Sequence, residues 1–138
     1  MQILDGKKVS QEIKDNLRKI IHESNQLQKR APHLAAILIG NNGASETYVA
    51  SKIRNCEEVG FKSSLVRFEN DVSESALVNA IEKLNTDDGV DGILVQLPLP
   101  KHINEEKIIN LINPDKDVDG FHPISTGKLV QGTPTFIP

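Results

Sequence analysis

The chain has 138 residues, of which 38% are hydrophobic and 25% are charged, and its net charge is -3. This composition is typical of a globular domain and excludes a disordered chain, and the absence of a basic excess argues against a nucleic-acid binder. No apolar stretch reaches membrane-spanning length, and a lone cysteine, Cys56, excludes an intramolecular disulfide and a thiolate metal cluster. We therefore expect a cytoplasmic protein with one core, no metal, and no membrane or nucleic-acid partner.

The first half of the chain alternates between helical and strand patterns. A helix is expected over residues 7–28, capped by Asp5, with one buried stripe. A buried strand follows over 34–39, and a helix over 44–59 should end at Gly60 in a left-handed conformation. Residues 61–69 alternate between apolar and polar, which predicts a strand near the sheet edge. The stripe of the first helix consists of Val9, Ile13, Leu17, Ile20 and Ile21.

The second half continues the alternation and then loses it. Ser73 is expected to cap a helix that has Leu77 and Ile81 on its apolar face. Asn104 is expected to cap a short helix that runs through residue 112. Between them, the apolar run over 91–97 predicts the central strand, buried on both faces. Residues 114–138 are rich in turn residues and are interpreted as loop. The fold class expected is α/β, a three-layer α/β/α domain with a mainly parallel sheet.

Gln96 interrupts the apolar run at its carboxyl end, and Pro98 and Pro100 should stop the pairing of the strand just beyond it. In open α/β sheets, ligands bind beyond the carboxyl ends of the strands, so Gln96 is a candidate ligand contact. The alternative is a glutamine whose amide is satisfied by the loop backbone.

Lys52 falls on the apolar face of the second helix, four residues from Tyr48 and four from Cys56. A lysine in that position either extends to water along its apolar stem or loses its charge, and lysines of the second kind serve enzymes as bases and proton shuttles. A structural lysine at the rim of the core is the more frequent outcome from pattern alone.

Asp119 belongs to the late loop, where it alternates with Asp117 around Val118. A single aspartate that faces the crevice would suit recognition of an amino-substituted ring edge by charge-assisted hydrogen bonds. The alternative is an aspartate that caps a turn. A calcium site is a weak prediction, because the two aspartates lack further oxygen ligands at the spacing of a calcium loop.

The turn at residues 40–43 has two glycines instead of the three of a dinucleotide fingerprint, and Ser45 has no triad partner at a suggestive spacing. The four histidines show no metal-ligand spacing and are interpreted as structural or surface residues.

Three segments resemble one family closely: ASETYVASK at 44–52, DGILVQLPLP at 91–100 and KDVDGFHP at 116–123. They are similar to the amino-terminal domain of the bifunctional methylenetetrahydrofolate dehydrogenase and methenyltetrahydrofolate cyclohydrolase. The resemblance runs from the first helix to the end of the chain, and its second and third segments are highly specific.

This resemblance implies an oxidoreductase and hydrolase of one-carbon metabolism. The full-length protein would oxidise 5,10-methylenetetrahydrofolate with NADP, or alternatively NAD, and hydrolyse the methenyl product to 10-formyltetrahydrofolate, which serves purine biosynthesis; related enzymes are homodimers. Tyr48 would stack on the folate, and Asp119 would hold the pterin edge. Lys52, oriented by Gln96 and kept partly neutral by its surroundings, would serve the hydrolytic step. The implied substrate-binding residues are Tyr48, Lys52, Val95, Gln96, Leu97, Pro98 and Asp119.

The sequence also departs from the family pattern. Gly43 stands where proline is common and Ser125 where asparagine is usual, and both are expected to affect loops. Residues 1–120 are expected to form the folate-binding domain and 121–138 a connection toward an NADP-binding Rossmann domain that this chain lacks, so the chain alone should show no dehydrogenase activity. A stand-alone folate-binding module without catalysis is the alternative. A response-regulator-like domain is disfavoured because Gly40, Asn41 and Asn42 stand where it needs acids.

Overall fold

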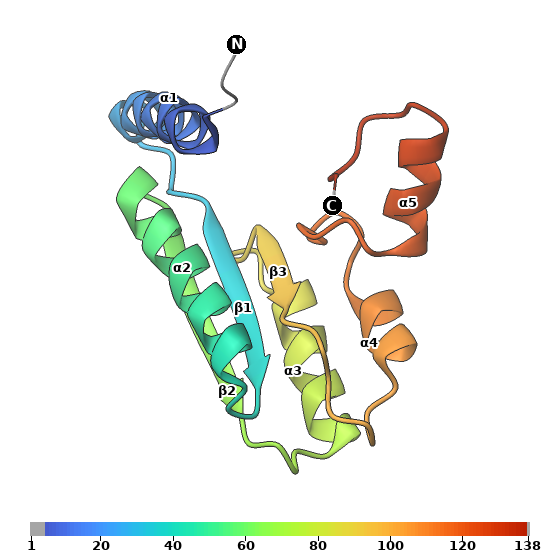
Figure 1. The fold of residues 1–138 in the computed structure, drawn as a ribbon. Coiled ribbons are helices and arrows are strands. Elements are labelled where there is room, and N and C mark those ends of the chain that lie inside the picture. Colours follow the sequence, from blue (N-terminus) through green and yellow to red (C-terminus); the bar gives the residue numbers. More distant parts are fainter. Residues whose placement is uncertain (1–4, 138) are drawn as a thin grey trace.

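The computed structural model describes residues 5–137, which form five helices and three strands around one sheet (Figure 1). No helix among these residues has both the length and the apolar character needed to cross a bilayer. In chain order the elements are α1 (Gly6–Gln26), β1 (His33–Ile39), α2 (Gly43–Val59), β2 (Lys62–Phe68), α3 (Glu74–Thr86), β3 (Gly92–Val95), α4 (Glu105–Leu111) and α5 (Pro123–Val130).

The sheet is parallel and has the strand order β2-β1-β3. β2 is an edge strand, as its alternating pattern predicted. The expectation that the apolar run after residue 91 forms the central strand is wrong, because within residues 5–137 β1 pairs with a strand on each side and β3 pairs with β1 alone. β3 is nevertheless buried along its whole length, since an isolated parallel bridge between Ile93 and Asp117 covers its outer side. β3 is therefore buried on both faces although a strand pairs with it along only one of its two edges.

The three expected layers are confirmed by two apolar clusters, one on each face of the sheet. Successive side chains of a strand point to opposite faces. Accordingly, Leu38 and Leu94 pack against Val49 of α2, whereas Ile37 and Ile93 belong to the cluster on the opposite face. That second cluster is completed by residues of α3 and α4, namely Leu77, Ile81 and Ile108.

The helix ends follow the local signals in the sequence. Asp5, Ser73 and Asn104 are N-caps whose side chains accept hydrogen bonds from backbone N–H groups of the first turn, which lack partners within the helix. Gly60 ends α2 with φ of 87°, and a Cβ added there would lie 3.2 Å from Cγ2 of Ile21. Glycine is therefore favoured at position 60 by its conformation and by its neighbour.

The first helix departs from expectation, because Ile21 is the only buried residue of the predicted stripe. Val9, Ile13 and Ile20 are each more than half exposed, and no element within residues 5–137 covers them. α1 packs on α2 instead of on the sheet, and both Lys14 and Arg18 pair with Glu58 there. A cavity of about 860 Å³ between α1 and α2 includes Val9, Ile13, Leu17, Cys56, Val59 and Phe61 in its lining and none of the candidate site residues.

The interpretation of residues 114–138 as loop is wrong for Pro123–Val130, which form α5. Turn-rich composition hid a helix start: Pro123 occupies the first turn, where its missing N–H costs nothing, and the His122 side chain accepts a hydrogen bond from Ile124 N. Figure 1 shows α5 beside α4 and away from α1 and α2.

Candidate functional site

Gln96 follows the last residue of β3, where the pairing of the strand stops. Its backbone N–H donates to Ile37 O at 2.9 Å, and its side-chain Nε2 donates to Leu97 O at 2.8 Å. Its Oε1 is buried and has no hydrogen-bond partner among the described residues. The backbone thus satisfies one half of the amide and leaves the acceptor half without a partner, which is costly unless a ligand or water supplies a donor.

Asp119 is positioned by the segment that covers the outer side of β3. Ile93 N donates to Lys116 O at 2.7 Å, and Ile93 pairs with Asp117 in a parallel bridge. Asp119 lies two residues after Asp117, and Val95 lies two residues after Ile93. Both line one small cavity together with Leu97. The bridge therefore brings Asp119 to the carboxyl end of β3, the end at which Gln96 lies.

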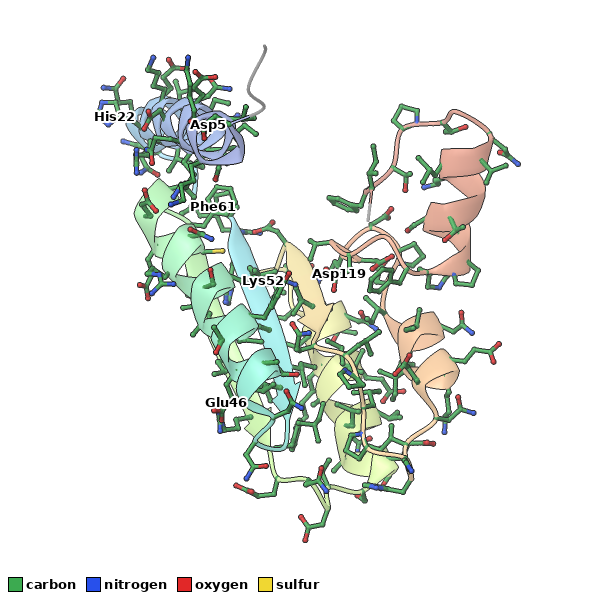
Figure 2. The ribbon with its side chains drawn as sticks, viewed as in Figure 1. Asp5, His22, Glu46, Lys52, Phe61 and Asp119 are labelled. Atoms are coloured by element: carbon green, nitrogen blue, oxygen red, sulfur yellow. The ribbon has the colours of Figure 1, made fainter. Side chains whose placement is uncertain are left out.

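Lys52 reaches the same region from α2. Its Nζ lies 3.6 Å from Oδ1 of Asp119, and the two side chains are 32% and 27% exposed. Figure 2 shows the two labelled residues on separate elements, Lys52 on α2 and Asp119 in the loop before α5. Lys52 therefore does not extend freely to water along an apolar stem, and a carboxylate stands beside its ammonium group. No hydrogen bond joins Lys52 to Gln96 in the described part of the chain.

Burial raises the pKa of Asp119 above its usual value, Lys52 opposes that shift, and Asp117 adds to it. A raised pKa means that the folded state holds this proton more tightly than the unfolded chain does. The contribution of Asp119 to stability is therefore present below its unfolded pKa and is lost as pH rises through its folded pKa. An ionised Asp119 is thus a net cost to folding, which a cationic or hydrogen-bond-donating ligand would offset.

Tyr48 lies one helical turn before Lys52 and is 66% exposed, so its ring is open to a stacking partner. Pro98 is also exposed, Leu97 is half-buried, and Val95 is only 6% exposed. The structure thus places Lys52 against Asp119, and both Gln96 and Val95 at the end of the neighbouring strand.

Asp117 and Ser125 are the residues of this region that the sequence analysis undervalued. They are 2% and 1% exposed, and Ser125 Oγ donates to Asp117 Oδ2 at 3.1 Å. A partial signal was present, since Asp followed closely by glycine is typical of a turn in which the carboxylate bonds the backbone ahead of it, as Asp117 does with Gly120 N. The described residues contain no group of three or more His, Cys, Asp or Glu side chains that could hold a metal ion.

The turn between β1 and α2 does not fit the pyrophosphate of a dinucleotide. A phosphate at a helix N-terminus needs free backbone N–H groups. Those of Ala44 and Ser45 already donate to Asn42 Oδ1, at 3.0 and 3.1 Å. This turn therefore does not provide the cradle that the pyrophosphate of NADP needs.

Comparison with known proteins gives a consistent result. A family model described as tetrahydrofolate dehydrogenase/cyclohydrolase, catalytic domain, matches residues 4–119. The bifunctional protein FolD of Porphyromonas gingivalis is 54% identical over 136 residues, which are 99% of this chain and 46% of that protein. FolD of Bacteroides thetaiotaomicron is 50% identical over 137 residues, 99% of this chain and 47% of that protein. The chain thus spans about half the length of the curated relatives it matches.

Solved structures agree with this match. The FolD methylenetetrahydrofolate dehydrogenase/cyclohydrolase of Campylobacter jejuni has a TM-score of 0.94 and 44% identity, over 99% of this chain and 48% of that chain. The Trypanosoma brucei enzyme, solved with NADP cofactor and inhibitor, has a TM-score of 0.91 and 30% identity, over 99% of this chain and 46% of that chain. The fold, the match over residues 4–119 and these relatives together show that the chain belongs to the tetrahydrofolate dehydrogenase/cyclohydrolase family, as its catalytic domain.

Proposed function

We propose that this chain is the folate-binding catalytic domain of a bifunctional enzyme that oxidises 5,10-methylenetetrahydrofolate and hydrolyses the methenyl product to 10-formyltetrahydrofolate. The observation that carries the proposal is the contact between Lys52 and Asp119, 3.6 Å apart, at the strand end where Gln96 holds a buried acceptor without a partner. Family membership and the relatives named FolD support the same assignment.

Asp119 and Tyr48 are the proposed folate-binding groups. The amino-substituted edge of a pterin presents neighbouring N–H donors, and a carboxylate accepts such donors in charge-assisted hydrogen bonds. Asp119 is partly buried and so is shielded from water, which strengthens those bonds. The exposed ring of Tyr48 offers a flat apolar face to the folate, one helical turn from Lys52.

Lys52 is the proposed residue for the hydrolytic step, as acid, base or electrostatic anchor. A methenyl group carries a positive charge, and an ammonium group alone would repel it. The carboxylate of Asp119 beside Lys52 offsets that repulsion by its opposite charge, which is a different means from the partly neutral lysine that the resemblance implied. A lysine in this position can hold or move a proton at the water that attacks the one-carbon unit.

Gln96 is the proposed orienting group. Its Nε2 is held by Leu97 O, which fixes the plane of the amide and directs Oε1. Because Oε1 has no partner among the described residues, it is available to Lys52 or to the substrate. Val95, Leu97 and Pro98 would form the apolar wall next to the folate.

The nicotinamide cofactor would be held by the part of the full-length protein that corresponds to the other half of the relatives, since the turn at Asn42 does not fit it. NADP is the proposed acceptor. Three finer points rest on the resemblance alone: cytoplasmic location, a homodimer, and a formyl product that feeds purine biosynthesis.

Lys52→Met in the full-length enzyme tests this proposal. The substitution keeps the length and apolar stem of the side chain, so packing should survive within about 1.5 kcal/mol. Loss of a positioned acid or base costs roughly a hundred- to ten-thousand-fold, so methenyltetrahydrofolate hydrolysis should fall by that order. Hydride transfer needs no proton shuttle and should fall less.

Both reactions would be assayed on the purified variant beside a thermal melt. A well-folded Lys52→Met enzyme that hydrolyses methenyltetrahydrofolate at the parental rate would show that Lys52 has no part in the hydrolytic step. If the parental full-length protein binds tetrahydrofolate but turns over neither substrate, the alternative of a folate-binding module without catalysis replaces the proposal.

A further inference from the structure

Asp117 is a buried carboxylate to which the proposed chemistry gives no part. It is 2% exposed and lies in the loop between α4 and α5, on the outer side of β3. A carboxylate removed from water is costly to the fold unless hydrogen bonds replace the lost solvation. The groups that donate hydrogen bonds to the Asp117 carboxylate therefore indicate which part of the structure this buried charge organises.

Among the described residues, every hydrogen bond to the Asp117 carboxylate comes from the eight residues that follow it. Gly120 N donates to Oδ1 at 3.1 Å, and both His122 N at 2.9 Å and Ser125 Oγ at 3.1 Å donate to Oδ2. The chain from 118 to 125 is thus folded around one anion. Gly120 has φ of 68°, the left-handed conformation that this tight return of the chain requires.

The start of the same loop is fixed to the sheet. Asp117 pairs with Ile93 in the parallel bridge, and Val118 packs into the apolar cluster beneath α2. A Cβ added at Gly92 would come within 2.5 Å of Val118 Cγ1, so Val118 lies directly on the backbone of β3. Asp119 therefore has a fixed residue on its amino side and a bonded turn on its carboxyl side.

We propose that Asp117, assisted by Ser125, is the positioning residue that holds Asp119 against Lys52 so that Asp119 can receive the pterin ring. The inference rests on the proposed folate-binding function of this site. Neither Asp117 nor Ser125 contacts the substrate. A displacement of about 1 Å at Asp119 would misalign both the pterin hydrogen bonds and the Lys52 contact, and misplacements of that size are enough to reduce turnover strongly.

The test is a double-mutant cycle in the full-length enzyme with Asp117→Asn, Asp119→Asn and the double variant. Asp117→Asn keeps the side-chain volume, but it places an amide N–H₂ where an oxygen now accepts from His122 or Gly120. We expect the KM for 5,10-methylenetetrahydrofolate to rise roughly 10- to 100-fold, since a misplacement of about 1 Å at a positioned group costs up to about a hundredfold, with a smaller change in kcat. The double variant should be no worse than Asp119→Asn alone, because Asp117 acts through Asp119.

Two further variants separate positioning from stability. Ser125→Ala removes one of the three hydrogen bonds and keeps the charge, so it should raise the KM less than Asp117→Asn does and give the same non-additivity with Asp119→Asn. Ile81→Val on α3 removes one methyl group from the core away from the loop. It should lower the Tm and leave the KM unchanged.

The inference is overturned if Asp117→Asn has the parental KM, or if the effects of the Asp117 and Asp119 substitutions multiply. If Asp117→Asn does not fold, the Ser125→Ala cycle decides by the same two criteria. Should Asp119→Asn itself leave the KM unchanged, the proposed folate site fails and the inference fails with it. If Asp119→Asn raises the KM while both loop variants leave it unchanged, only the positioning role of Asp117 fails.

Discussion

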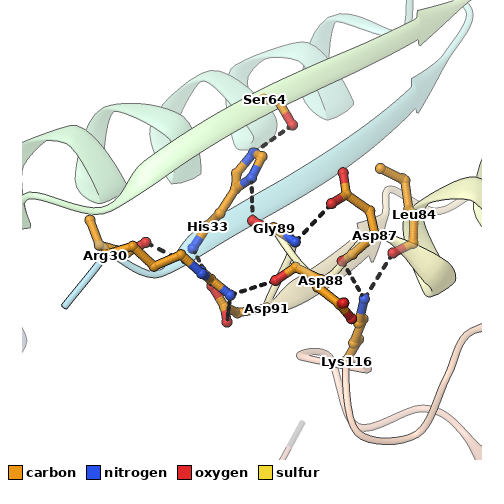
Figure 3. A network of polar contacts seen from close by, with 10 residues as sticks. Arg30, His33, Ser64, Leu84, Asp87, Asp88, Gly89, Asp91 and Lys116 are labelled. Carbon is orange, nitrogen blue, oxygen red and sulfur yellow. Dashed lines mark hydrogen bonds and ion pairs between the residues drawn. The ribbon is translucent and has the colours of Figure 1, made fainter.

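The polar side chains at the two ends of the sheet differ in how fully they are hydrogen-bonded. At the amino ends of β1 and β3, Arg30 makes a two-pronged contact with Asp91, with distances of 2.5 and 2.8 Å, and also donates to Asp88 O (Figure 3). The backbone N–H of His33 donates to the same Asp91 carboxylate at 2.8 Å. This cluster ties the chain before β1 to the chain before β3.

The rest of the amino-end network is equally complete. The two ring nitrogens of His33 lie within hydrogen-bond distance of Gly89 O and Ser64 Oγ, and Lys116 Nζ donates to two backbone carbonyls (Figure 3). At the carboxyl end of β3, by contrast, Lys52 and Asp119 are 3.6 Å apart and Oε1 of Gln96 has no partner among residues 5–137. A fold whose polar groups are satisfied at one end, and which holds a buried acceptor without a donor at the other, is expected where the second end binds a ligand.

Asp119→Ala should show the largest effect on substrate binding that separates the two ends. Hydrogen bonds to charged groups contribute about 1.5–3 kcal/mol, so the KM for methylenetetrahydrofolate should rise roughly 10- to 150-fold. Stability should change little, because burial raises the pKa of this carboxyl and the ionised group is already a cost to the fold. Steady-state kinetics and a thermal melt of the full-length protein measure both. A collapse of the Tm with an unchanged KM would make Asp119 a turn cap.

Gln96→Met should separate function from stability at a second position. Methionine has nearly the same length, and it removes an acceptor that now has no partner together with the donor to Leu97 O. Because these two losses oppose each other, the free energy of unfolding should change by no more than about 1 kcal/mol. Hydrolysis of methenyltetrahydrofolate should nevertheless fall by roughly 10- to 100-fold, since a misplacement of about 1 Å at a positioned group costs up to about a hundredfold. Unfolding in urea and the hydrolysis assay test the two parts, and an equally active variant would show that Gln96 is structural.

Asp91→Asn should have the smallest effect, and it should act on stability alone. Arg30 lowers the pKa of Asp91, and the His33 N–H adds to this. The Asp91 side chain is 44% exposed, so solvent screening limits the loss to about 1 kcal/mol.

The pH dependence of that loss has a defined sign. A carboxyl with a lowered folded-state pKa stabilises the fold above its unfolded pKa, near 3.8, and this stabilisation disappears as pH falls through the folded value. Parental protein and Asp91→Asn should therefore differ in Tm near neutral pH, begin to converge as pH falls through the unfolded pKa, and meet only below the lowered folded-state pKa. A difference that persists in acid would point to packing instead of charge.

The local features of the fold could be predicted from the sequence because each depends on neighbouring residues. Asp5, Ser73 and Asn104 cap the helices expected of them, and Gly60 ends α2. Features that depend on distant segments could not be predicted. Which strand is central depends on the neighbours that each strand acquires, and the exposure of α1 depends on what lies against it.

The candidate site shows the same division. Lys52 and Gln96 were detectable because each breaks an apolar pattern on its own element. The contact between Lys52 and Asp119 was not, since it depends on the parallel bridge between Ile93 and Asp117, which joins residues 24 positions apart. The buried state of Asp117 was missed because one of its donors, Ser125, lies in a helix that the turn-rich composition concealed, and the other two, Gly120 and His122, lie in the turn before that helix.

The most direct test of the contrast between the two ends is one substitution made at each of them. Lys52→Met and Arg30→Met both replace a cation by the same apolar side chain, one beside Asp119 and one beside Asp91. Methenyltetrahydrofolate hydrolysis and the Tm would be measured for both variants in the full-length protein. We predict that Lys52→Met loses at least a hundredfold in hydrolysis while its Tm stays near the parental value, and that Arg30→Met keeps its activity and has the lower Tm of the two. Equal losses of activity in the two variants, or a Tm that falls more for Lys52→Met, would contradict the account.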